Sequence, residues 1–132
     1  MAEGKYEETL AKADQLRLDG QYDEALKLYE ECLAERPDDT AALYGRALVF
    51  NYTGEFERSL EELERIRDMA PNFVKARVHL GLTYTMLGMY EEGKKELKEV
   101  LKIDPGNPEA LKHLSYFPDE NGSAGEEGNY VL

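Results

Sequence analysis

Hydrophobic residues recur along this chain at the spacing of amphipathic helices, in blocks separated by short polar segments. The first block has apolar residues at positions 10, 13, 16 and 18, and the second has them at 22, 25, 26, 29, 32 and 33. Two further pairs of blocks run through residues 43–50 and 56–66, and through residues 78–87 and 90–103. Each pair predicts two consecutive amphipathic helices.

Glycine and proline punctuate these blocks at a constant step of 34 residues. A glycine stands between the two blocks of each pair, at Gly20, Gly54 and Gly88. An aromatic residue follows each glycine two positions later. Each pair is closed by a proline: Pro37, Pro71 and Pro105. Glycine commonly ends a helix in the left-handed conformation, and proline cannot continue one. We therefore expect one helix pair repeated three times, over residues 6–39, 40–73 and 74–107.

Two positions in each unit, one per predicted helix, hold small side chains. They are Ala13, Ala47 and Gly81 in the first helices and Ala25, Ser59 and Gly93 in the second. Small residues let two helix backbones approach closely, so we expect the helices to cross at these positions and to resist larger side chains. Side-chain oxygens are predicted to cap the following helices from Asp39, Thr40, Asn72 and Asn107.

The helical pattern begins a fourth time after Pro105. A short helix over about residues 107–116, with Pro108 in its first turn, is predicted to cover the open end of the last unit. We expect residues 1–117 to form one repeat domain. Residues 118–132 are rich in glycine and acid before an apolar Tyr130-Val131-Leu132, and we expect them to be a flexible, disordered acidic tail.

The chain resembles the tetratricopeptide repeat family in its 34-residue step, its two small positions, the Gly with an aromatic two later, and the closing Pro. This resemblance covers about residues 6–105 and implies an all-α fold, a right-handed α-solenoid of three helix-turn-helix repeats with a capping helix. Four positions depart from the usual apolar residue: Thr9 and Arg77 early in their helices, and Lys12 and Arg46 before the small residue.

Charge and cysteine content restrict the partners and the compartment. With 28 acidic and 16 basic residues the net charge is −12, which repels nucleic acid and favours a protein or peptide partner with cationic and apolar residues. The single cysteine, Cys32, cannot form an intrachain disulfide. No secretory leader or run long enough to cross a membrane is recognised, so we expect no membrane insertion and a cytoplasmic location.

The sequence offers little for catalysis. His79 and His113 stand 34 residues apart on equivalent predicted helices, but no further metal ligand accompanies them at the right spacing. Cys32 has no histidine in its own repeat and is expected to be a buried, small hydrophobic residue. We find no phosphate-binding or nucleotide motif. The sequence therefore predicts a protein that is not an enzyme and that holds no cofactor or metal.

In tetratricopeptide repeat proteins the first helices line a concave groove, and the resemblance carries a peptide-binding groove over to this chain. Its residues would be Leu10, Asp14, Arg17, Tyr44, Leu48, Asn51, Tyr52, Lys75, Val78, His79, Leu82 and Met86. Five of them, Leu10, Tyr44, Leu48, Val78 and Leu82, would form an apolar band. Such a band either binds an apolar segment of a partner or packs between adjacent helices as ordinary core. The groove is the interpretation that we favour.

Some co-chaperones of this family grip acidic C-terminal peptides with a carboxylate clamp of lysines, asparagines and an arginine. The aligned positions here are Leu10, Asp14, Gly45, Lys75 and His79, and only Lys75 matches. A heat-shock-protein tail is therefore a poor candidate ligand. The sequence favours an adaptor or co-chaperone-like scaffold that binds an apolar or mixed segment. The alternatives are a protein that self-assembles through its ends or its tail, and a secretion-type chaperone.

Overall fold

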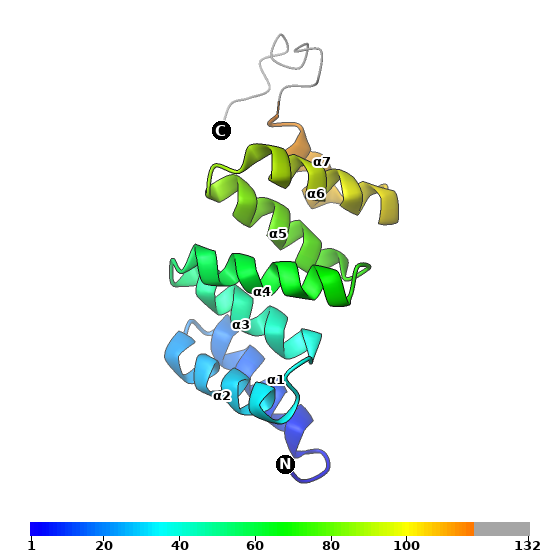
Figure 1. Ribbon diagram of the computed structural model, residues 1–132. Helices are drawn as coiled ribbons and strands as arrows, with labels where there is room; N and C mark the ends of the chain where they lie inside the picture. Colours follow the sequence, from blue (N-terminus) through cyan, green and yellow to red (C-terminus); the bar gives the residue numbers. More distant parts are fainter. Residues whose placement is uncertain (118–132) are drawn as a thin grey trace. The chain divides into compact units, whose positions relative to one another are not determined.

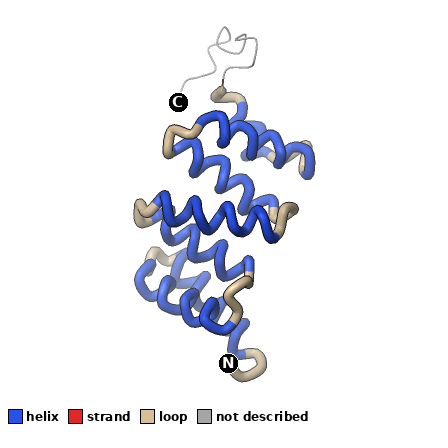
Figure 2. The backbone as a smooth tube through the Cα atoms, viewed as in Figure 1, coloured by secondary structure: helices blue, strands red, loops and turns tan. Residues whose placement is uncertain are grey.

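The computed structural model describes residues 1–117, and this part of the chain is built of helices joined by short loops, without a strand (Figure 1). The helices are α1 (Lys5–Leu18), α2 (Tyr22–Glu35), α3 (Thr40–Tyr52), α4 (Phe56–Met69), α5 (Val74–Met86), α6 (Tyr90–Ile103) and α7 (Pro108–Leu114). Figure 2 shows the alternation of helix and loop. The predicted all-α class, the three helix pairs and the short seventh helix are confirmed. The tail expected at 118–132 lies outside the described residues.

The turn inside each helix pair follows from its glycine. Gly20, Gly54 and Gly88 have φ angles of 81°, 84° and 80°, in the left-handed region where a side chain would be strained. The amide after each glycine donates to the carbonyl five residues earlier at 2.8 Å, as Gln21 does to Leu16. This is the hydrogen bond of a Schellman helix end, so the predicted role of the three glycines is confirmed.

Two of the four predicted caps are present. The Asp39 carboxylate accepts from the Ala41 amide at 3.2 Å, and the Asn107 side chain accepts from the Ala110 amide at 2.9 Å. Asn72 does not cap α5, since the residue at the cap position is Phe73, one residue closer to the helix. Thr40 is the first residue of α3, because Asp39 already occupies the capping position.

The chain divides into two compact units, Met1–Ala70 and Pro71–Leu132, which we describe separately. In the first unit, α1 packs against α2 and α3, and α3 packs against α4. A buried cluster of Ala13, Ala25, Tyr29 and Val49 joins α1, α2 and α3. The predicted small positions of this unit, Ala13, Ala25, Ala47 and Ser59, are fully buried.

In the second unit, α6 packs against α5 and α7, and α7 also contacts α5. Val78, Leu97, Val100 and Ala110 form its buried cluster. The crossing of α5 and α6 has no room for side chains at its two glycines. A Cβ on Gly81 would lie 2.9 Å from Leu97 Cγ, and one on Gly93 would lie 2.5 Å from Thr85 Oγ1. The predicted close crossing at these small residues is confirmed for this helix pair.

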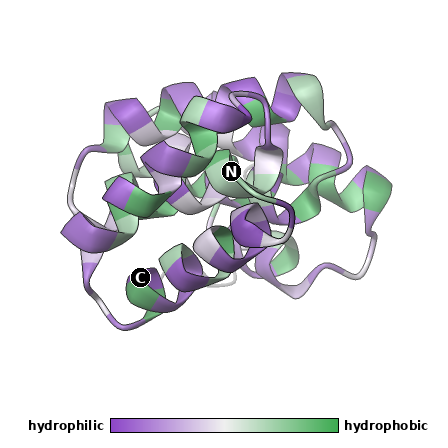
Figure 3. Ribbon diagram, turned by 90° about the horizontal axis from the view of Figure 1, so that it is seen from below, coloured by the Kyte–Doolittle hydropathy of each residue, from purple (hydrophilic) through white to green (hydrophobic). Residues whose placement is uncertain are grey.

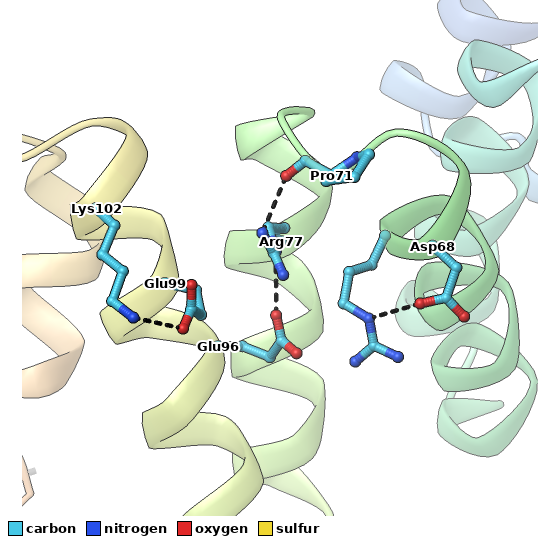
Figure 4. Close-up of polar contacts among 7 residues, drawn as sticks. Asp68, Pro71, Arg77, Glu96, Glu99 and Lys102 are labelled. Carbon is cyan, nitrogen blue, oxygen red and sulfur yellow. Dashed lines mark hydrogen bonds and ion pairs between the residues drawn. The ribbon is translucent and has the colours of Figure 1, made fainter.

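Two arginines that depart from the usual apolar pattern make ion pairs between the helices of their own repeat. Arg77 Nε donates to Glu96 Oε1 at 3.2 Å, and its Nη1 donates to the Pro71 carbonyl at 3.1 Å (Figure 4). Arg46 binds Glu62 with two nitrogens, the Nε to Oε2 distance being 2.9 Å. A polar first-helix residue is thus accommodated because the second helix supplies a carboxylate. Hydrophilic and hydrophobic residues alternate along the helices (Figure 3).

Candidate functional site

A polar cluster links α1 and α2 in the first unit. The Tyr29 hydroxyl of α2 donates to Asp14 Oδ1 at 2.5 Å and accepts from Arg17 Nε at 2.9 Å. Arg17 and Asp14 also form an ion pair across one turn of α1, at 3.7 Å. Two residues expected to flank a groove therefore balance each other's charge and are held by a buried phenol.

Gly45 on α3 makes room for this cluster. A Cβ at Gly45 would lie 2.3 Å from Cε1 and Cζ of the Tyr29 ring and 2.5 Å from its hydroxyl oxygen. The ring of Tyr29, itself fully buried, thus passes directly against the α3 backbone. Gly45, one of the five positions that align with a carboxylate clamp, is thus covered by a tyrosine ring.

Burial controls ionisation in this region. Burial, followed by the hydrogen bond to Asp14, raises the pKa of Tyr29 well above its usual range, so the phenol is a neutral donor. Burial works against the Arg17 charge, but the hydrogen bond to Tyr29 and the nearby Asp14 outweigh it, and the pKa of Arg17 is raised. Burial also raises the pKa of Tyr44 to about 12.

The predicted groove residues fall into both units. Leu10, Asp14, Arg17, Tyr44, Leu48, Asn51 and Tyr52 belong to α1 and α3, and Lys75, Val78, His79, Leu82 and Met86 belong to α5. Among those of the first unit, Tyr52 is 59% exposed and stacks on Tyr22, with ring centroids 5.7 Å apart. Among those of the second unit, Met86 is 56% exposed.

The apolar band is less exposed than the favoured interpretation required. Leu48 is 5% exposed and Val78 is 6% exposed, so both are core residues. Val78 is buried because it packs with Leu97, Val100 and Ala110. Leu10, Tyr44 and Leu82 keep part of their surface accessible. The accessible part of the candidate surface is therefore more aromatic and polar than the sequence indicated.

An apolar pocket of about 460 Å³ lies in the second unit, among α5, α6 and α7. Its walls are Leu82, Thr85, Tyr90, Glu91, Lys94, His113, Tyr116 and Phe117. Tyr90 meets Phe117 edge to face at 6.4 Å between centroids, and His113 meets Tyr116 in the same way at 5.6 Å. The sequence placed Leu82 on the predicted groove but did not predict this pocket, although the aromatic residues just after α7 were a visible signal.

The reactive residue types occupy structural positions. His113 lies 3.5 Å from Glu109 on its own helix. Cys32 is fully buried, and burial together with Asp39 raises the pKa of its thiol. Within residues 1–117, no three His, Cys, Asp or Glu side chains gather as metal ligands, and no helix has the length and apolar character to cross a membrane.

Comparison with known proteins places these features in a family. The model of the tetratricopeptide repeat matches residues 16–79 and 52–115, so this chain belongs to that family. A search of curated proteins finds no match to the sequence.

Solved structures with the same fold include two tetratricopeptide domains in complex with peptides. The first tetratricopeptide domain of Spaghetti (RPAP3), bound to an HSP90 peptide, is 24% identical with a TM-score of 0.79, over 83% of this chain and 87% of that one. The second domain of human RPAP3, in complex with an HSP70 peptide, is 22% identical with a TM-score of 0.75, over 81% and 89%. The Sgt2 domain from Aspergillus fumigatus is 18% identical with a TM-score of 0.81, over 93% and 83%.

Proposed function

We propose that this chain is a non-enzymatic adaptor or co-chaperone-like scaffold that binds a peptide segment of a partner protein through α1 and α3, the first helices of its first two repeats. The chain belongs to the tetratricopeptide repeat family, and two solved structures with the same fold contain a bound peptide. Both findings support an interaction module. In the proposal, residues 1–117 are the binding domain. The supporting feature for a cytoplasmic site of action is the single, buried cysteine.

The observation that carries the choice of ligand is the packing of Tyr29 on Gly45. Gly45 is one of the five positions that align with the carboxylate clamp of related co-chaperones, and it has no side chain that could bind a carboxylate. Here Tyr29 covers it, and the Asp14 carboxylate beside it is paired with Arg17, so this cluster offers a carboxylate ligand no unbalanced cation. An acidic peptide is therefore disfavoured, and a segment with cationic and apolar residues fits the half-buried Leu10 and Tyr44 and the chain's net charge of −12.

Peptide titration tests this proposal. The probes are fluorescein-labelled seven-residue peptides that combine Lys or Arg with Leu or Phe, and the HSP90 peptide SRMEEVD is the acidic comparison. We expect the best cationic peptides to bind at least about tenfold more tightly than SRMEEVD. Tyr52→Ala is expected to weaken their binding by about fivefold, since aromatic anchors dominate such contacts. Tyr52 suits this purpose better than Leu48, whose replacement would disturb the core.

Tyr90→Ala is the matched control, because Tyr90 is equally exposed but belongs to the second unit. Equal affinity of the Tyr52→Ala variant and the unaltered chain would reject the surface on α1 and α3. Tighter binding of SRMEEVD than of every cationic peptide would reject the proposed ligand chemistry.

A further inference from the structure

The pocket of the second unit exists because α7 is short. Helix α7 has 7 residues, whereas α5, which holds the equivalent place in its repeat, has 13. The end of α5 and the beginning of α6 therefore lack the cover that two more turns of α7 would supply. Leu82, Thr85 and Tyr90, which line the pocket, come from this uncovered region.

Helix α7 ends at Leu114, and the sequence that follows does not favour a longer helix. Pro118 follows Phe117, and a proline disfavours helical geometry in the residue before it. Phe117, the last described residue, is already part of the pocket wall. The next apolar group along the chain is Tyr130-Val131-Leu132, and 12 residues, 118–129, separate it from Phe117. A chain of 12 residues reaches up to about 40 Å, which is ample for a return to the pocket.

Charge favours the same occupant. Helix α6 carries four lysines and four glutamates, and its lysines, Lys94, Lys95, Lys98 and Lys102, gather on one side. They line a second depression of about 380 Å³, together with Glu91 and Glu99. Glu91 lies 3.7 Å from Lys94 and Glu99 lies 2.9 Å from Lys102, so part of this positive charge is already balanced.

The connecting residues carry charge opposite to the excess of lysine over glutamate in the lining of this depression. Residues 118–129 contain four acidic residues, Asp119, Glu120, Glu126 and Glu127, and no basic one. They also contain three glycines, which ease a reversal of the chain. An acidic connection along the lysines of α6 would place the apolar group at the pocket, beside Lys94.

We propose that Tyr130-Val131-Leu132 of the same chain occupies the pocket among α5, α6 and α7, with the acidic connection lying along the lysines of α6. The segment buries the apolar wall that α7 leaves open, and aromatic contact of Tyr130 with Tyr90 and Phe117 orients it. This intramolecular contact concerns a surface of the second unit and goes beyond the peptide-binding surface on α1 and α3.

Amide nuclear magnetic resonance of the intact chain tests the contact. We compare the unaltered chain with a variant in which Tyr130, Val131 and Leu132 are each replaced by serine. The expected result is a change in the amide shifts of Thr85, Tyr90 and His113, with the amides of α1 to α3 unaffected. A second variant, Tyr90→Ser, is expected to shift the amides of residues 130–132. The control is Tyr52→Ser, which removes an equally exposed tyrosine of the first unit and is expected to leave those amides unchanged.

Varying the protein and salt concentrations distinguishes residues 130–132 of the same chain from a second copy of the chain as the occupant of the pocket. An intramolecular contact gives the same spectrum after tenfold dilution, and raised salt weakens it because the α6 lysines take part. Shift changes confined to residues 126–132 in the triple-serine variant would overturn the proposal. Pocket shifts that vanish on dilution would also overturn it, since they would assign the pocket to a second copy of the chain.

Discussion

Tyr29 and Gly45 show how a single pair of residues decides the chemistry of a surface. The tyrosine reaches from α2 to hold Asp14 and Arg17 of α1, and it does so only because α3 has no side chain at position 45. Neither residue belongs to the 34-residue pattern of glycines. A side chain that balances two charges from a neighbouring helix is a property of the folded unit, and pattern analysis along one helix does not detect it.

Gly45→Ala is predicted to destabilise the first unit. The new Cβ would lie 2.3 Å from the Tyr29 ring, so the ring or the helix must move, at a cost of about 1–3 kcal/mol. Urea unfolding followed by circular dichroism measures the change. Gly106→Ala is the matched control, because a Cβ there meets no atom within 4 Å. A variant at position 45 as stable as the control would show that Tyr29 does not pack as described.

At the scale of the element, each helix pair is held by a crossing at small residues and by a turn at glycine. Gly81 and Gly93 bring α5 and α6 into backbone contact, and fully buried Ala25 and Ala47 hold the equivalent places in the first unit. These positions were predictable because a close crossing restricts side-chain size in every repeat. The ion pair of Arg77 and Glu96 was not, since it depends on which faces of α5 and α6 meet.

Enlarging a crossing residue is predicted to loosen its helix pair. Ala25→Leu and Ala47→Phe would each force added atoms into fully packed space and lower the free energy of unfolding by about 1–3 kcal/mol. Thermal unfolding reports the effect. Ala34→Leu, at an exposed site on α2, serves as the control for the change in side chain. Unchanged melting temperatures at positions 25 and 47 would contradict the crossing.

At the scale of the whole molecule, buried tyrosines link stability to alkaline pH. Burial raises the pKa values of Tyr6, Tyr29 and Tyr44, all in the first unit. In the unfolded chain a tyrosine ionises near pH 10. Above that pH the unfolded state loses protons that the folded state retains, so the stability present below about pH 10 is lost as the pH rises toward the folded pKa values.

We therefore predict that the midpoint of urea unfolding falls steadily between about pH 9.5 and pH 12. Tyr29→Phe is expected to be less stable at pH 8, because it loses the hydrogen bonds to Asp14 and Arg17, and to show a shallower alkaline decline. Tyr90→Phe, which alters a largely exposed tyrosine of the second unit, is the matched control for the substitution. Parallel curves for Tyr29→Phe and the unaltered chain would count against a raised pKa.

The sequence by itself determined the repeat: its step, its turns and the positions of its close crossings. These features are local, because a left-handed turn needs glycine and a proline ends a helix whatever surrounds it. The sequence also correctly predicted that Asp39 and Asn107 cap the helices that follow them. Its prediction of a cap at Asn72 was wrong, because α5 begins one residue later than that cap requires.

Tertiary structure decided what the repeat presents to a partner. It buried Leu48 and Val78, joined Tyr29 to Asp14 and Arg17, and left a pocket where α7 stops after 7 residues. Each of these depends on side chains from two or three helices meeting at one place. Helical periodicity specifies which side of a helix is apolar, whereas the exposure of an individual residue depends on the neighbours that cover it.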